Sequence, residues 1–198
     1  DTQKYTYDEL GRPKKLEIVD DATGTVASFT EEYTFDARGR VTTVANDLGS
    51  TTYAFVGQSP RPSTVALPNG MQTHFDYFGA TTDFALKQIK NLSSGSSPSI
   101  LSQFDYTYRP DRAIDTWKVD QGAGATTWSF GYDGARQLTK ADRRDASQTL
   151  LESLSYAYDK AGNRTQAGTG TTAPKNYEVN PLNQLLSERD HGRTTFAG

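Results

Sequence analysis

Residues 33–40 read Tyr33-Thr34-Phe35-Asp36-Ala37-Arg38-Gly39-Arg40, and this pattern decides the fold. Two aromatic residues flank one small polar residue, and an Asp and a Gly follow. In a β-strand, residues two apart point to the same face, so both rings lie on one face and Thr34 lies on the other. The Asp can accept backbone hydrogen bonds, and the Gly can take the left-handed conformation of a tight loop. The stretch predicts the first strand and the turn of a β-hairpin.

The aromatic pair recurs eight times, with second members 20 to 31 residues apart, and it includes all 11 tyrosines of the chain. Self-similarity at such a period is typical of repeat architectures, in which each unit buries its apolar face against its neighbours. We predict that the pair members are structural repeat anchors: Tyr5, Tyr7, Tyr33, Phe35, Tyr53, Phe55, Phe75, Tyr77, Tyr106, Tyr108, Phe130, Tyr132, Tyr156, Tyr158 and Tyr177, the last paired with Val179.

A second strand is predicted after each turn, because short runs with β-branched residues and partial period-two alternation follow it. The clearest of these runs are residues 16–18, 41–44, 114–119 and 185–187. The leucine-rich stretch 146–155 is short for a helix and leads directly into an anchor pair, so we interpret it as strand. The fold class predicted is all-β: an antiparallel repeat sheet of about eight consecutive β-hairpins, open and curved, forming a single array over residues 1–198.

The Tyr-Asp-x-x-Gly-Arg pattern resembles the YD repeat of the RHS family. These are large bacterial repeat proteins, also represented in animal teneurins and in insecticidal toxin complexes. The resemblance covers nearly the whole chain and is strongest at residues 7–12, 35–40 and 158–162.

The turn glycine of this pattern is replaced in three hairpins, by Arg112, Arg136 and Asn183. Asn tolerates the left-handed conformation, whereas Arg adopts it at a steric cost. We therefore predict a different turn geometry at Arg112 and Arg136.

The resemblance implies a long antiparallel sheet that spirals into a hollow shell around a C-terminal polypeptide, often a toxin. This chain is too short to close a shell. It begins at Asp1, and residues 194–198 read as the first strand of a ninth hairpin, so we expect an array truncated at both ends. The implied partners are the remaining repeats of the parent shell and the enclosed cargo, in a larger bacterial protein that is secreted or on the cell surface. The self-cleaving region of the family has no match here, so no catalytic residue is carried over.

Composition excludes several classes of function. The net charge of −3 is spread without large blocks, which argues against nucleic-acid binding. No run approaches the roughly 18 apolar residues of a membrane span. The absence of cysteine excludes disulfides and thiolate metal sites.

Candidate chemistry is sparse. The only histidines, His74 and His191, are far apart in the sequence, so we expect structural or solvent-exposed roles and no ordinary zinc site. Acidic residues recur in the turns at Asp8, Asp36, Asp133 and Asp159, and a residue that recurs at the turns is interpreted as serving the turn. We predict no catalytic residue, no cofactor and no metal.

Trp117 and Trp128 lie near a Gly-rich connector, where exposed aromatic rings could stack on sugars. Cross-strand packing is the favoured interpretation, because aromatic pairs on neighbouring strands stabilise a sheet. The predicted function is a non-enzymatic segment of an RHS-type β-shell that encloses and helps deliver a C-terminal effector. Two alternatives stay open: a cell-surface adhesion module that binds carbohydrate or a receptor, and a glycan-degrading β-solenoid enzyme.

Overall fold

A computed structural model describes residues 2–122, 124–190 and 193–196. In this part of the chain the only helix is one short 3-10 helix, η1 (Ala80–Thr82), and all other regular structure is β-strand. The chain divides into two compact units, Asp1–Ser102 and Gln103–Gly198.

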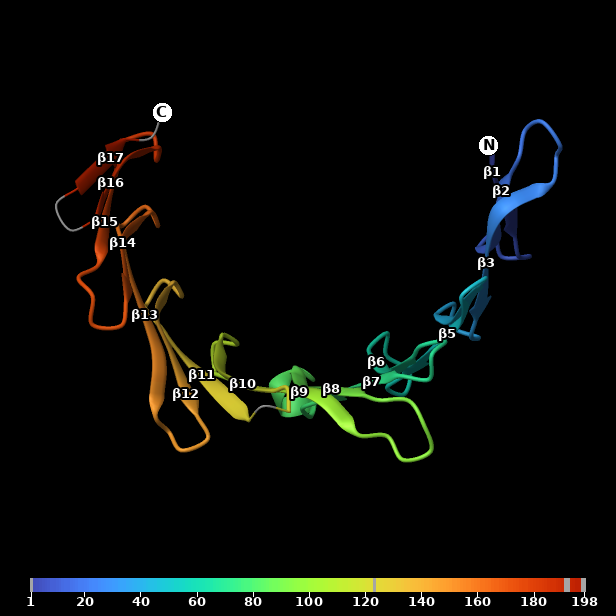
Figure 1. Ribbon diagram of the computed structural model, residues 1–198, viewed down its shortest axis with the longest axis horizontal. Helices are drawn as coiled ribbons and strands as arrows, with labels where there is room; N and C mark the ends of the chain where they lie inside the picture. Colours follow the sequence, from blue (N-terminus) through green and yellow to red (C-terminus); the bar gives the residue numbers. More distant parts are fainter. Residues whose placement is uncertain (1, 123, 191–192, 197–198) are drawn as a thin grey trace. The chain divides into compact units, whose positions relative to one another are not determined.

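The first unit is a meander in which each strand pairs antiparallel with the next (Figure 1). Its strands are β1 (Thr2–Tyr7), β2 (Pro13–Val19), β3 (Val26–Phe35), β4 (Val41–Asn46), β5 (Gly49–Phe55), β6 (Pro62–Ala66), β7 (Gln72–Tyr77) and β8 (Leu86–Leu92). The unit boundary falls inside β9 (Ile100–Tyr108).

The second unit continues the same pattern of antiparallel pairing from β9 onward. Its further strands are β10 (Ile114–Asp120), β11 (Ala125–Tyr132), β12 (Leu138–Asp145), β13 (Leu150–Tyr158), β14 (Arg164–Thr169), β15 (Lys175–Val179), β16 (Leu185–Asp190) and β17 (Arg193–Phe196). Taken by itself, each unit is an open sheet whose ribbon bends along the strand order (Figure 1).

These observations confirm the predicted all-β class and the succession of antiparallel hairpins. The predicted return strands lie in β2, β4, β10 and β16. Of the leucine-rich stretch, residues 150–155 lie in β13, as predicted, whereas residues 146–149 form the turn before it, so the strand interpretation is wrong for those four residues. The predicted start of a ninth hairpin falls partly on β17, while residues 197–198 and His191 lie outside the described residues.

The same register irregularity is present in every hairpin. The second anchor is the last residue of its strand and pairs with the first residue of the return strand, as Tyr7 does with Pro13 and Phe35 with Val41. One residue of the return strand is then skipped, so each hairpin has a β-bulge at the same place. A bulge bends its strand and increases the local twist. Because the bulge is at the same place in every hairpin, each return strand is bent at the same position.

Six of the eight hairpins close with the same five-residue turn, residues 8–12 in the first hairpin. The amide of the first turn residue donates to the carbonyl of the fifth, and the amide of the fourth donates back to the carbonyl of the first. The fourth residue has a positive φ, for example 79° at Gly39. The third and fourth hairpins, which lack the Asp, have longer turns over residues 56–61 and 78–85.

The predicted difference in turn geometry at Arg112 and Arg136 is wrong. Arg112 has φ 72° and Arg136 has φ 65°, and both turns keep the two backbone hydrogen bonds of the glycine turns. The paired strands fix the two ends of a five-residue loop, so the loop retains its path although arginine adopts it at a cost of about 1–2 kcal/mol. Asn183 takes the same conformation at φ 60°, as predicted.

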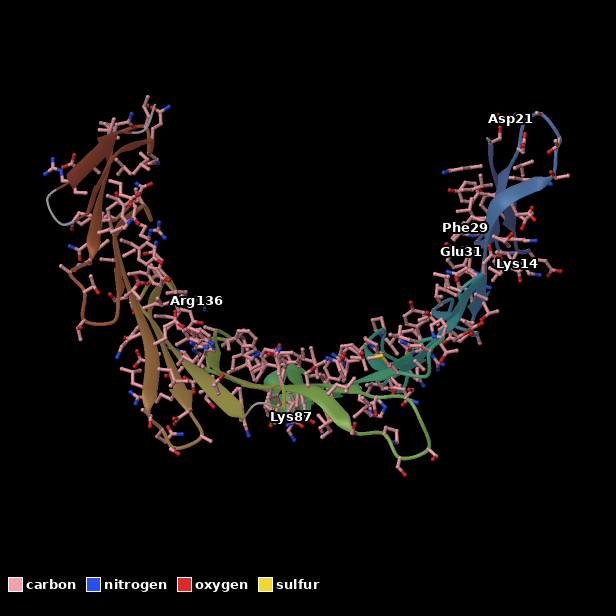
Figure 2. All side chains as sticks on the ribbon, in the orientation of Figure 1. Lys14, Asp21, Phe29, Glu31, Lys87 and Arg136 are labelled. Carbon is pink, nitrogen blue, oxygen red and sulfur yellow. The ribbon has the colours of Figure 1, made fainter. Side chains whose placement is uncertain are left out.

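Each sheet has an aromatic face and a polar face. We call the face that carries the anchors the anchor face and the face that carries the spacers the polar face. Figure 2 shows Phe29 and Glu31 on one side of the ribbon of the first unit and Lys14 on the other. On the polar face, Lys15 lies 2.8 Å from Glu17, and in the second unit Lys140 lies 2.9 Å from Asp142.

No second layer of secondary structure covers either face in the part of the chain that the structure describes. Most side chains are therefore only half-buried, and the buried residues there are Ala141, Asp142 and Ser187. Without a central core, the stability of the fold depends on contacts between neighbouring hairpins, as in other quasi-one-dimensional arrays.

Candidate functional site

The aromatic anchors line up on one face because they occupy the same place in each hairpin. The pairs end strands β1, β3, β5, β7, β9, β11, β13 and β15. Tyr5 and Tyr7 in the first hairpin are 46% and 60% exposed, whereas the later anchor rings are half-buried. The first pair has no preceding hairpin among the described residues to cover it.

The turn aspartate organises its own loop. Asp36 Oδ1 accepts hydrogen bonds from the amides of Arg38 at 2.8 Å and Arg40 at 3.0 Å. Asp36 Oδ2 accepts from the Arg40 guanidinium, with Nε and Nη2 both at 2.6 Å. The backbone bonds recur at Asp8, Asp133 and Asp159, so the interpretation of these acids as turn residues is confirmed.

The hydrogen bonds in these turns lower the pKa of the turn aspartates. The amide of Arg12 is the largest influence on Asp8 and lowers the pKa of that carboxyl, with burial opposing it and the Arg12 guanidinium adding to it. The pKa of Asp159 is also lowered, first by the side-chain amide of Asn163 and then by backbone amides. Both carboxyls stay ionised in their turns.

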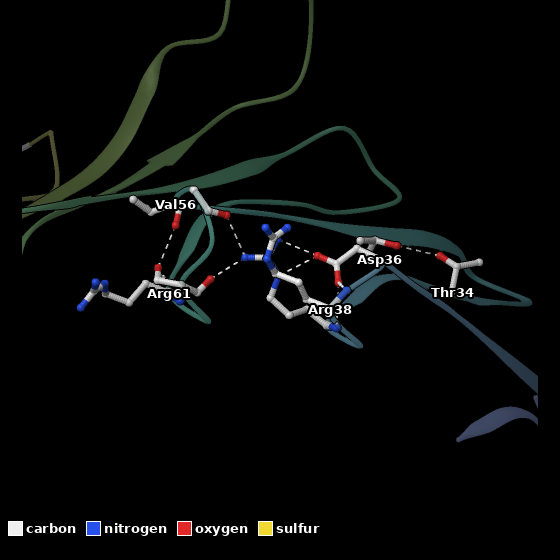
Figure 3. A network of polar contacts seen from close by, with 9 residues as sticks. Thr34, Asp36, Arg38, Val56 and Arg61 are labelled. Carbon is white, nitrogen blue, oxygen red and sulfur yellow. Dashed lines mark hydrogen bonds and ion pairs between the residues drawn. The ribbon is translucent and has the colours of Figure 1, made fainter. Parts of the chain in front are cut away.

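The turn arginine also contacts the next hairpin. The Arg40 guanidinium donates to the carbonyl of Gly57 at 3.0 Å and that of Ser59 at 2.5 Å. Figure 3 shows the network of polar contacts around these turns, with Asp36, Val56 and Arg61 labelled. Its carbon Cζ lies 4.4 Å from the centre of the Phe55 ring. Arg40 therefore joins the second hairpin to the third through two carbonyl contacts and a cation–π contact, while its ion pair with Asp36 lies within its own turn.

The same contact is repeated along the chain. Cζ of Arg12 lies 4.3 Å from the ring centre of Phe35, and Cζ of Arg61 lies 5.8 Å from that of Tyr77. In the second unit, Arg109 lies 5.4 Å from Tyr132 and Arg164 lies 4.6 Å from Tyr177. We call this series the arginine ladder: a cation from one hairpin lies over an anchor ring of the next.

Tyrosine anchors add a second connection, in the opposite direction. The hydroxyls of Tyr77, Tyr132 and Tyr158 donate to backbone carbonyls at 2.9 to 3.0 Å. The acceptors are the first residues of the preceding return strands, Pro62, Ile114 and Leu138. Phe35 and Phe55 lack a hydroxyl, and their arginines lie closest to the ring among the anchors.

The sequence contains a signal for the arginine ladder. Arg12, Arg40 and Arg61 each stand directly before a return strand, just as the anchors end the outgoing strand. In the sequence alone, this recurrence indicates only a turn motif. Each guanidinium covers a ring of the next hairpin, so its partner depends on the register between neighbouring hairpins. The local sequence pattern does not specify that register.

One anchor has a strongly perturbed hydroxyl. The Tyr33 hydroxyl donates to the Glu31 carboxylate on the same strand, which together with burial raises the pKa of Tyr33 to about 12. Burial also raises the pKa of Tyr106, Tyr108 and Tyr132. The hydroxyls of these four tyrosines therefore stay protonated at neutral pH.

The two tryptophans lie on the anchor face, directly opposite each other on β10 and β11. Trp117 also stacks on Phe104, and Trp128 stacks on Phe130, each with 6.4 Å between ring centres. Arg143 lies over Trp128 at 5.6 Å. Both side chains are half-buried. The predicted cross-strand packing partners are thus in place, and sugar stacking stays a prediction.

His74 lies in β7 on the polar face, and its Nε2 is 2.9 Å from Gln72 Oε1. Residues 2–122, 124–190 and 193–196 contain no group of three metal-ligating side chains. No helix in the same residues is long and apolar enough to span a membrane.

Comparison with known proteins shows what the chain is similar to. No protein-family model and no curated protein matches it. Among solved structures, the crystal structure of TcdB2-TccC3-TEV matches 91% of the chain with a TM-score of 0.56 at 15% identity. The chain spans 12% of that protein.

Two further solved structures match with lower TM-scores. A Photorhabdus luminescens Tc holotoxin pore matches 92% of the chain at 14% identity, over 14% of its own length, with a TM-score of 0.34. A porin-like protein from Bacteroides uniformis matches 98% at 11% identity, over 86% of its length, with a TM-score of 0.43. Of these three matches only TcdB2-TccC3-TEV has a TM-score above 0.5, and at 15% identity it shows a likeness of fold alone: the chain has a fold similar to part of that protein.

Proposed function

We propose that this chain is a non-enzymatic structural segment of an RHS-type β-shell. The shell encloses a C-terminal effector polypeptide and helps to deliver it, as part of a larger bacterial protein that is secreted or exposed on the cell surface.

One observation carries the proposal: each unit is a single-layer sheet in which the arginine ladder joins neighbouring hairpins, at five places among the described residues. A globular binding domain would bury its aromatic residues in a core, whereas here the anchor rings stay half-exposed on one face. Such a sheet is suited to being a wall. Its polar face suits solvent, and its aromatic face suits many weak contacts with a polypeptide.

The fold likeness supports the same conclusion. The YD pattern at residues 7–12, 35–40 and 158–162 resembles a family that is represented in toxin complexes, and TcdB2-TccC3-TEV has a similar fold over most of the chain. The sequence pattern and the fold comparison are separate observations that favour one class of protein.

The test is protease protection in the full gene product that contains these residues. Trypsin should leave the C-terminal polypeptide intact while the shell is closed. Arg40→Ala should expose the polypeptide to cleavage, because it removes one connection between hairpins. Arg38→Ala in the same turn is the matched control and should keep protection, because only its backbone amide bonds Asp36 in the described structure.

Two outcomes would overturn the proposal. Cleavage of the C-terminal polypeptide at the same rate in intact and denatured protein would show that nothing is enclosed. Tight binding of a defined glycan, abolished by Trp117→Ala, would favour the adhesion module instead.

A further inference from the structure

A hollow of about 480 Å³ opens on the anchor face of the second unit, between β13, β14 and β15. The middle strand contributes Ala167, Gly168 and Thr169, and the flanking strands contribute the anchor rings Tyr156 and Tyr177. Its volume is within the range of roughly 300–1,000 Å³ that is typical of ligand pockets in proteins.

The hollow exists because the return strand of the seventh hairpin carries small residues. The residue that pairs with the first anchor is Leu16, Val44, Val65, Ile89 or Trp117 in the first five hairpins. In the sixth it is Ala141, which is only 3% exposed. In the seventh it is Ala167, which stays half-exposed and lines the hollow.

Arg164 lines the same hollow and differs in its role from the turn arginines of the first hairpins. In the first two hairpins one arginine both pairs with the turn aspartate, at 2.6 Å, and covers the next anchor. The seventh hairpin divides these roles. Asn163 donates to Asp159 at 2.9 Å, and Arg164 covers Tyr177.

Arg164 is exposed and makes no ion pair within the described residues, so its guanidinium can accept a new partner. Lys175 also lines the hollow, but it lies 2.5 Å from Glu188 and is already neutralised. The hollow therefore combines an apolar aromatic lining with one available positive charge.

We propose that this hollow binds an acidic aromatic segment of polypeptide. An aromatic side chain fills the space above Ala167 between the two tyrosine rings, and a neighbouring carboxylate pairs with Arg164. A planar guanidinium suits bidentate recognition of a carboxylate, and ring-on-ring contact favours an aromatic over an aliphatic side chain. This inference rests on the proposed function, since the enclosed effector would supply the segment.

The experiment uses ¹⁵N-labelled protein and capped dipeptides as probes. Acetyl-Glu-Phe-amide should shift the amide signals of residues 167–169 saturably. Acetyl-Gln-Phe-amide and acetyl-Glu-Ala-amide should bind more weakly, because each lacks one of the two groups. Phenylacetate tests whether a free small acid is sufficient, and binding equal to that of the dipeptide would overturn the assignment to a polypeptide.

Two variants test the two halves of the site, each with a matched control. Arg164→Gln should weaken the Glu-Phe probe roughly fivefold, as expected for loss of a partly exposed ion pair, while Lys160→Gln in the adjacent turn should not. Ala167→Leu should abolish binding by filling the hollow, while Ala161→Leu in the exposed turn should not.

Equal binding of all three dipeptides, or no effect of Arg164→Gln and Ala167→Leu, would overturn the site. Failure of the site is distinguishable from failure of the proposed function. A protected C-terminal polypeptide without probe binding would refute only the hollow, whereas probe binding without protection would refute the shell.

Discussion

At the residue scale, the turn arginine has two partners in different hairpins. Arg40 satisfies the Asp36 carboxylate within its own turn and covers Phe55 in the next hairpin. Lysine would keep the charge but lose the planar fork that makes both contacts at once. The position is therefore sensitive to changes that conserve charge.

Arg40→Ala should lower the free energy of unfolding of the first unit by about 2 kcal/mol. The estimate combines a charge-assisted hydrogen bond with a partly exposed cation–π contact. Arg38→Ala should change it by less than about 0.5 kcal/mol, as expected of an exposed side chain. Denaturant titration of both variants measures the difference, and equal losses would show that the arginine ladder does not stabilise the fold.

The turn aspartates should make the protein sensitive to acid. The pKa of Asp8 is lowered in the folded state, so its contribution is present above the unfolded value, near 3.9, and is lost as pH falls through the folded value. The melting temperature should therefore decrease as the pH is lowered from about 4.

Asp8→Asn separates this charge effect from the turn geometry. Asn180 makes the same two backbone contacts in the eighth hairpin, at 2.9 and 3.0 Å, so asparagine is compatible with the turn. The variant should melt somewhat lower at pH 7 and lose less on acidification than the unmodified protein. An unchanged acid profile would assign the effect to other groups. Scanning calorimetry between pH 7 and pH 2 makes the comparison.

At the element scale, the hairpin turn imposes its shape on residues that disfavour it. Arg136 has φ 65° and the same backbone hydrogen bonds as the glycine turns. The strain is local, and the paired strands on both sides maintain it.

Arg136→Gly should stabilise the second unit by about 0.5–1 kcal/mol. Relief of the left-handed strain exceeds the added freedom that glycine gives the unfolded chain. Ala135→Gly in the same turn should destabilise it, because Ala135 does not have a positive φ. If both variants lose stability in urea titrations, the arginine is not strained.

The tyrosine hydroxyls give a second measure of coupling between hairpins. Tyr132→Phe removes the 2.9 Å bond to the Ile114 carbonyl and should cost about 1 kcal/mol. Tyr7→Phe should cost close to nothing, because Tyr7 is 60% exposed and its strand is first in the array. Equal costs in thermal melts would contradict an inter-hairpin role for the hydroxyl.

At the scale of the whole molecule, each unit has an aromatic face that no second layer covers among the described residues, and the first unit exposes the edge of β1. Uncovered apolar surface and unpaired edge backbone both favour association. The first strand combines the two features, since every residue of β1 is exposed.

The isolated chain should therefore self-associate reversibly in analytical ultracentrifugation as its concentration rises. Tyr7→Lys should weaken association by placing a charge on the anchor face of β1. Thr6→Lys adds the same charge to the polar face and should have a smaller effect. A strictly monomeric chain at high concentration would refute the prediction.

The strands, the two faces and the turns that contain Asp and Gly follow from the sequence alone. Each depends on residues close in the chain: the i, i+2 alternation sets the faces, and Asp with Gly closes the loop. Tyr33-Thr34-Phe35-Asp36 is enough to predict a strand end and its turn, and the same local pattern identified the anchors throughout.

Which side chains meet across hairpins is visible in the three-dimensional structure and not in the sequence pattern. The β-bulge at each strand end, the placement of Arg40 over Phe55 and the hydroxyl bond of Tyr132 all depend on the register of neighbouring strands. The hollow at Ala167 likewise depends on what the flanking strands leave unfilled. The strand register and the side chains that fill the anchor face are set by contacts between residues about ten to twenty positions apart. A local pattern therefore predicts each hairpin but not the surface that neighbouring hairpins form together.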